Sequence, residues 1–296
     1  MKSVIRYFSI FSLAVFAACT PGQHIAQLND QALEAYEAGQ YEEALALYES
    51  LIHSRRAEGE FVGGANFNRA GLSAWAVGDT TRALEYLDAA RHTEAANEQT
   101  FAALAKAYRG IDNLSREITN LETYLERYPG GDEADDFRTR LFETYVESNN
   151  HQQAMALWEQ LPADARQKEH ILEAYFSVNK DLGNDNKADK LAHRLLAINE
   201  NNVPALEWLA QKHFWLAENR YQAEMKAYEQ NRTHRQYARL LEALEIINTD
   251  FRIALNYFNR LYRMDPAPSY ARFIGNIYLR FDDKERADYY HRRANQ

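Results

Sequence analysis

The chain has 296 residues, of which 46% are hydrophobic and 26% charged, and its formal net charge is −9. This apolar fraction excludes wholesale disorder and collagen-like repeats. The single cysteine excludes an intramolecular disulfide framework and a thiolate-rich zinc site. Only 12 Gly and 6 Pro stand beside 19 Tyr and 14 Phe, a balance that favours long helices packed through aromatic side chains.

The N-terminus has the layout of a secretory signal. Lys2 and Arg6 precede a run over residues 7–18 that is almost all apolar and ends in small residues. The run is too short to span a membrane. The sole cysteine, Cys19, follows directly after Phe16-Ala17-Ala18. This tetrapeptide resembles the lipobox of bacterial lipoproteins, with Phe in the place of the usual Leu, and the resemblance implies cleavage before the cysteine and its lipidation, including palmitate.

We therefore expect residues 1–18 to be a removed signal peptide, residues 19–26 to be a lipidated cysteine with a polar tether, and the folded part to cover 27–296. Several acyl chains on Cys19 would make the anchor permanent. Thr20 stands where an inner-membrane retention signal would have Asp, and no acidic cluster follows. The resemblance thus implies the periplasmic face of the outer membrane. The alternative is an ordinary secreted protein with an incidental cysteine.

The rest of the chain is built of repeats. Residues 36–48 are the clearest unit, with a Gly, an aromatic residue, an Ala and a second aromatic residue in turn. Eight aligned units begin near residues 25, 64, 98, 135, 169, 203, 235 and 268, in steps of 32 to 39 residues. A small residue recurs as Ala44, Ala83, Ala154, Ala188, Ala223, Ala254 and Ala287, with Glu117 in its place in the third unit.

Further positions repeat with the same period. Four residues after the small residue stands a large one: Tyr48, Leu87, Leu121, Trp158 and Phe258. Gly71 and Gly275 occupy the position in the first helix where two backbones would crowd. These positions and the period of about 34 residues resemble the tetratricopeptide repeat family over residues 25–296. The resemblance implies an all-α, right-handed solenoid of about eight antiparallel helix pairs, with no second domain.

The resemblance also implies a concave groove lined by the first helix of each pair. Carried onto this chain, its lining positions are Asn68, Trp75, Lys106, Arg109, Glu207, Gln211, Phe214, Arg239, Arg272 and Asn276. We add Trp215, because aromatic residues gather at the irregularly spaced sixth unit and are favoured at interfaces. The Lys/Asn set with which chaperone-binding relatives hold a terminal carboxylate is not reproduced. The alternatives are solvated helix faces and, for Phe214 and Trp215, core packing.

Charge is distributed unevenly along the chain. Residues 20–204 have a net charge of −14, whereas residues 205–296 have a net charge of +3, and 12 of the 15 basic residues there are Arg. Such a chain could hold two different partners or one dipolar partner, although the imbalance could also be drift. The acidic balance of the whole chain argues against a nucleic-acid partner.

Motifs of catalysis are absent from the sequence. We find no His-Glu-x-x-His, no Gly-rich phosphate loop and no Gly-x-Ser-x-Gly elbow, and the nine His are scattered. We therefore expect no enzyme, no cofactor and no metal. Instead, we expect a lipid-anchored scaffold of the bacterial envelope that binds proteins or peptides, similar in layout to outer-membrane assembly factors, pilotins and adaptors of cell-wall hydrolases.

Two alternatives remain open at this point. One is a small-ligand or enzymatic site between the C-terminal repeats, around His213, Trp215 and Arg239, which would need a deep closed pocket. The other is a structural homo-oligomer.

Overall fold

The computed structural model describes residues 21–296, and the expected signal peptide and Cys19 lie outside this range. Within it the chain forms α-helices and two short 3-10 helices, without a strand. The chain divides into two compact units, the first ending at Phe137 and the second beginning at Arg138, and each is described by itself. None of the helices of residues 21–296 is both long and apolar enough to cross a membrane.

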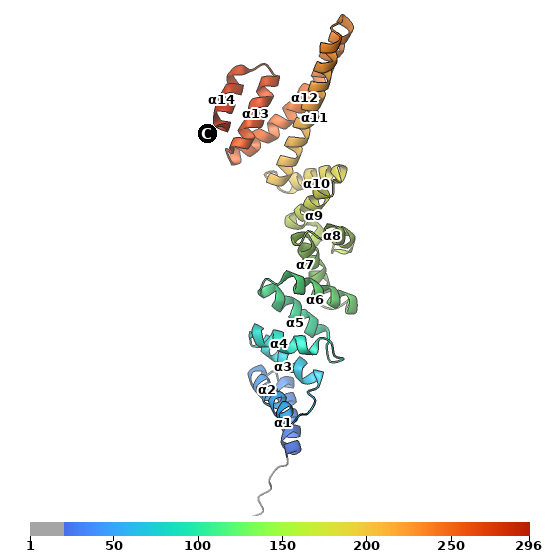
Figure 1. Ribbon diagram of the computed structural model, residues 1–296, viewed down its shortest axis with the longest axis vertical. Helices are drawn as coiled ribbons and strands as arrows, with labels where there is room; N and C mark the ends of the chain where they lie inside the picture. The colour runs from blue at the N-terminus through green and yellow to red at the C-terminus, as the bar shows by residue number, and fades with distance from the viewer. Residues whose placement is uncertain (1–20) are drawn as a thin grey trace, which may run out of the picture. The chain divides into compact units, whose positions relative to one another are not determined.

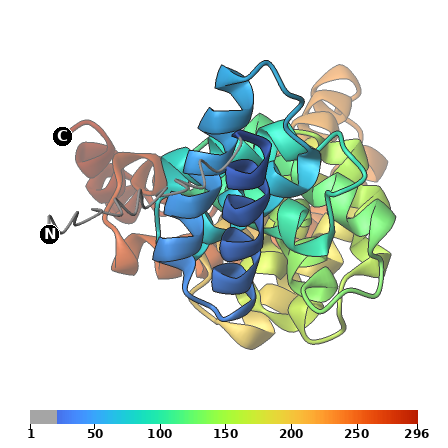
Figure 2. The same ribbon diagram turned by 90° about the horizontal axis from the view of Figure 1, so that it is seen from below.

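The first unit consists of antiparallel helix pairs. Its helices are α1 (Pro21–Glu37), α2 (Tyr41–Ala57), α3 (Gly64–Ala76), α4 (Thr80–Ala90), α5 (Glu98–Gly110) and α6 (Leu114–Arg127), and α7 (Ala134–Glu147) contains the boundary between the units. Each odd-numbered helix up to α5 packs against its successor, as the two blue helices α1 and α2 show (Figures 1 and 2).

The second unit continues the pattern with helices of very unequal length. It contains α8 (His151–Leu157), α9 (Glu169–Asp181), α10 (Asp185–Ile198), α11 (Val203–Gln230), α12 (His234–Met264), α13 (Pro268–Arg280) and α14 (Lys284–Ala294). The 3-10 helices Trp158–Gln160 and Ala165–Gln167 follow α8. The all-α fold of stacked helix pairs is thus confirmed, with seven pairs over residues 21–296.

A residue in the left-handed backbone region connects the two helices in six of these seven pairs. Its φ lies between 54° and 82°. The residues are Gly39, Gly78, Asp112, Asn149, Gly183 and Asp282. Gly, Asn and Asp adopt this conformation at the least cost. The sequence therefore encodes the turn within every pair except α11–α12.

The expected small residues lie where the helices of a pair approach each other. Six of the seven Ala residues have no exposed surface, and Glu117, in the corresponding position of the third pair, is 2% exposed. A Cβ atom on Gly71 would lie 2.6 Å from the Leu87 Cγ, and one on Gly275 would overlap the His291 ring. The predicted close approach of backbones is thus present at Gly71, where the Leu87 backbone nitrogen would lie 2.9 Å from the Cβ atom, whereas the close neighbour of Gly275 is the His291 side chain.

The expected sixth and seventh repeats are wrong. Instead of two helix pairs starting near 203 and 235, the segment forms one long pair, α11 and α12, of 28 and 31 residues. No Gly or Pro occurs between Ala205 and Asp265, so nothing ends either helix at the length of an ordinary repeat. Consequently Ala223 is exposed rather than packed, and no residue between Ala217 and Leu240 is buried.

The first helix also begins earlier than expected. Residues 21–26, which we expected to be part of a polar tether, already belong to α1 (Pro21–Glu37).

Candidate functional site

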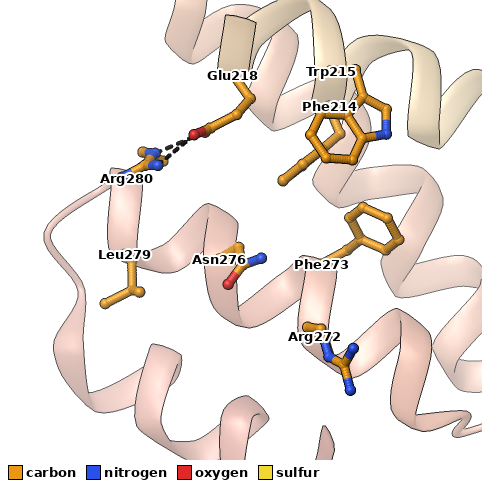
Figure 3. A pocket seen from close by; sticks show the side chains of 8 residues that line it. All are labelled: Phe214, Trp215, Glu218, Arg272, Phe273, Asn276, Leu279 and Arg280. Atoms are coloured by element: carbon orange, nitrogen blue, oxygen red, sulfur yellow. Dashed lines mark hydrogen bonds and ion pairs between the residues drawn. The ribbon is translucent and has the colours of Figure 1, made fainter. Parts of the chain in front are cut away.

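Helices α11 and α13, the first helices of the last two pairs, line a hollow of about 360 Å³ in the second unit (Figure 3). We call this hollow the α11–α13 groove. Its lining residues are Phe214, Trp215, Glu218, Arg272, Phe273, Asn276, Leu279 and Arg280.

Aromatic rings form the apolar part of the groove. Phe214 is 3% exposed and its ring meets that of Phe273 edge to face, with centroids 4.8 Å apart. The Trp215 ring stands nearly perpendicular to Phe273 at 6.4 Å, yet 51% of this tryptophan is exposed, and so is 47% of Leu279. The groove thus joins a packed aromatic floor to apolar side chains that are still in contact with water.

An ion pair forms part of the groove wall. The Arg280 Nε donates to Glu218 Oε2 over 2.8 Å, and a second guanidinium nitrogen donates to the other carboxylate oxygen, as Figure 3 shows. These hydrogen bonds, against some burial, hold the pKa of Glu218 below its ordinary value. The guanidinium of Arg280 also lies over the Tyr221 ring, 4.4 Å from its centroid. Both charges of the pair are therefore already matched.

Two hydrogen-bond donors on α13 remain available along the groove. Arg272 is exposed, and among residues 21–296 it forms no ion pair or side-chain hydrogen bond. The Asn276 Oδ1 lies 3.0 Å from the His291 Nε2, which leaves the amide NH₂ group for another partner. The groove consequently offers a guanidinium and an amide donor next to its aromatic floor.

The four groove positions predicted in the first unit differ in whether they line a hollow, are exposed or are buried in the core. Trp75 and Lys106 line a hollow of about 240 Å³, in which Lys106 pairs with Glu133. Arg109 is exposed and lines none of the described hollows. Asn68 does not face a groove: it is 5% exposed and its Oδ1 accepts a 2.7 Å hydrogen bond from the Thr100 hydroxyl, so it links α3 to α5 inside the core.

Glu207 and Gln211 line another hollow of about 280 Å³, between α9 and α11. The Tyr270 hydroxyl donates to the Glu207 carboxylate. Burial of the phenol, together with this hydrogen bond, raises the pKa of Tyr270 to about 12. Glu207 therefore already has a partner on α13.

The alternative site around His213, Trp215 and Arg239 is not assembled. The His213 Nδ1 lies 2.8 Å from Asp250 Oδ1, across the pair α11–α12. Arg239 is exposed near the far end of that pair, with its Nε 3.5 Å from a Glu224 oxygen. Trp215 alone lies in the groove. In the part of the chain that the structure describes, no three His, Cys, Asp or Glu side chains are placed to hold a metal ion.

The sequence reasoning missed half of the groove. It named Phe214, Trp215, Arg272 and Asn276, but not Glu218, Phe273, Leu279 and Arg280. On α13 the residues that line the groove include Arg272, Asn276, Leu279 and Arg280. They are three or four residues apart, which places them on one helix face. Extending that spacing from Arg272 would have found Leu279 and Arg280.

Comparison with known proteins concerns the fold. No family model matches the chain, and no curated protein matches it in sequence. A solved Bacteroides ovatus protein whose name proposes protein binding is 18% identical, with 75% of this chain and 100% of that chain covered and a TM-score of 0.51. A tetratricopeptide repeat protein from Parabacteroides merdae is 16% identical, with 93% of each chain covered and a TM-score of 0.39.

The C-terminal part of a tetratricopeptide repeat protein from Cytophaga hutchinsonii is 15% identical, with 89% of this chain and 92% of that chain covered and a TM-score of 0.44. At these identities only the fold is compared. Seven successive helix pairs over residues 21–296 carry the assignment, because six of them have a left-handed turn residue and six have a buried Ala at the close approach of their helices. The chain has the tetratricopeptide repeat solenoid fold.

Proposed function

We propose that the protein is a lipid-anchored scaffold of the bacterial envelope, on the periplasmic face of the outer membrane, and that it holds a segment of a partner protein in the α11–α13 groove. The observation that carries the proposal is the half-exposed Trp215 above an aromatic floor. Trp and Arg are the side chains that most often anchor protein–protein interfaces, and the groove contains both.

The form of the groove supports a polypeptide ligand rather than a small molecule. Large apolar side chains line it but remain about half exposed, as Trp215 and Leu279 do. Small-molecule sites bury about 70–90% of their ligand in a cleft, whereas an open groove leaves room for a chain to enter and leave at its ends. The ion pair Glu218–Arg280 is satisfied within the protein, so it shapes the wall instead of supplying an acid or a base.

The anchor rests on the sequence alone. Cys19 is the only cysteine, and it directly follows the apolar run and the small residues of the expected signal peptide. Several acyl chains hold a protein on a membrane far more firmly than one chain does. The scaffold would therefore keep its partner at the membrane surface for the lifetime of the complex.

Affinity purification from gently solubilised membranes of the native host tests the proposal. We expect one or more envelope proteins to co-purify with the wild type in stoichiometric amounts and to be lost from Trp215→Ala. The matched control is Ile246→Ala: Ile246 is 50% exposed in the same unit but does not line the groove, and this variant should retain the partner. Recovery of the intact protein alone would contradict the scaffold function.

The same preparation separates anchoring from binding. Cys19→Ala should move the protein from the membrane fraction to the soluble fraction, because the acyl chains can no longer be attached, while the folded chain still captures the partner. A Cys19→Ala protein that stays in the membrane fraction would refute the lipid anchor.

A further inference from the structure

We infer that the α11–α13 groove takes a protein segment that inserts one large apolar side chain and places a carboxylate group directly beside it. The inference rests on the proposed function, and it specifies the chemistry of the partner that this function requires.

The apolar half of the ligand follows from the size and lining of the groove. Its volume of about 360 Å³ is near the lower end of the roughly 300–1,000 Å³ found for binding pockets, so it has room for one large side chain but not for an extended apolar surface. Phe214, Trp215 and Phe273 present ring edges and faces to this space (Figure 3). Aromatic and long aliphatic side chains pack best against such walls.

The carboxylate of the ligand is inferred from the polar groups of the groove that still lack a partner. The Glu218 carboxylate and the Arg280 guanidinium satisfy each other through two hydrogen bonds. Of the groups that line the groove, this leaves the Arg272 guanidinium, the Asn276 amide NH₂ and the Trp215 indole N–H available, and all three are donors. A carboxylate can accept two parallel hydrogen bonds from a guanidinium, whereas a basic ligand would find the only lining carboxylate occupied.

The charge of the surrounding chain favours the same ligand. Residues 205–296 have a net charge of +3, against −14 for residues 20–204. An acidic segment would therefore be attracted to the part of the chain that forms the groove, and complementary charge raises the rate of encounter as well as specificity. Arg272 lies at the groove itself, where it adds a directed contact to this general attraction.

Selection from a displayed library of random ten-residue segments, using the detergent-solubilised mature protein as the target, tests the inference. Segments selected by the wild type should be enriched in Phe, Trp, Leu or Met next to Asp or Glu. Arg272→Glu should lose the enrichment in acids and gain one in Lys and Arg while keeping the apolar residue. Trp215→Ala should lose the apolar enrichment.

The control for net charge is Arg252→Glu, which makes the same charge change at an exposed position of α12 that does not line the groove. A selected segment, synthesised with its C-terminus amidated, should bind Arg272→Glu at least tenfold more weakly than the wild type and bind Arg252→Glu nearly as well. Tighter binding of the free-acid peptide would show that a terminal carboxylate, rather than a side-chain carboxylate, is the group recognised at Arg272.

Three results would overturn the inference: apolar segments selected without acids, equal loss of binding in Arg252→Glu and Arg272→Glu, or no segment selected at all. Co-purification of a partner that depends on Trp215 would leave the scaffold function standing in each case. Absence of any co-purifying protein would instead remove the scaffold function itself.

Discussion

The substitution Gly71→Ala tests the close packing on which the repeat architecture depends. Gly71 lies in α3, and a Cβ atom there would lie 2.6 Å and 2.7 Å from two Leu87 side-chain atoms and 2.9 Å from the Leu87 backbone nitrogen on α4. The backbone atom cannot be moved by a rotamer change. The two helices must therefore separate to admit one methyl group.

The expected cost follows from two opposing effects. Alanine is favoured over glycine within a helix by about 1 kcal/mol, and overpacking a close contact costs about 1–3 kcal/mol. Because the clash involves backbone as well as side chain, we expect the upper part of that range and a net destabilisation of about 1–2 kcal/mol. For a domain of this size, such a loss lowers the melting temperature by about 2–8 °C.

Circular dichroism at 222 nm during thermal unfolding measures the effect, with Gly110→Ala as the matched control. Gly110 is exposed at the last position of α5, and a Cβ atom there would meet nothing within 4 Å. The same substitution should therefore leave stability unchanged or raise it by up to about 1 kcal/mol. A Gly71→Ala protein that melts at or above the wild-type temperature would refute the close approach of α3 and α4.

Three further predictions concern the core, the groove and the long helix pair. Thr100→Val should destabilise the protein by about 1–3 kcal/mol in urea unfolding, because it leaves the buried Asn68 oxygen without its donor; an unchanged midpoint would mean that this bond does not stabilise the core. The folded-state pKa of Glu218 lies below its ordinary value, so its ion pair stabilises above the unfolded value of about 4.3 and is lost as pH falls through the folded pKa. The wild type should melt above Glu218→Gln by a constant margin at pH 5.5–7, and that margin should shrink below pH 4.5; a margin that widens in acid would contradict this sign. Removing two turns from each long helix, residues 224–230 and 234–240, should leave the melting temperature nearly unchanged, because almost all the deleted side chains are exposed or half-exposed; loss of cooperative unfolding would show that this end supports the rest of the unit.

The fold was predictable where a position of the repeat accepts only one or two residue types. Ala44 and Ala287 are fully buried at close helix approaches, and Gly39 adopts the left-handed φ that the turn requires. Such positions tolerate few alternatives, so their spacing remains visible in the sequence. The pair α11–α12 has no left-handed turn residue to mark where its helices end. The repeat that we predicted around Ala223 therefore rested on the average period alone, and it was wrong.

The groove was predictable only in part, because repeat positions specify a helix face but not what that face contacts. Asn68 satisfies the same positional rule as Asn276, yet it is buried against Thr100 while Asn276 lines the groove. The side chain that occupies Asn68 lies 32 residues away in sequence, on another helix pair, so the repeat position alone does not reveal it. Arg280 was missed for the same reason, since its role depends on an ion pair with Glu218, 62 residues earlier.

Photo-crosslinking in living cells tests the central claim, that the α11–α13 groove holds a segment of another protein, most directly. A photoreactive amino acid replaces Leu279, which is 47% exposed and lines the groove, or Ile246, which is 50% exposed and lies outside it. We predict one discrete crosslinked product from position 279, abolished by Arg272→Glu in the same chain, and none from position 246. Equal products from both positions, or none from either, would contradict the account.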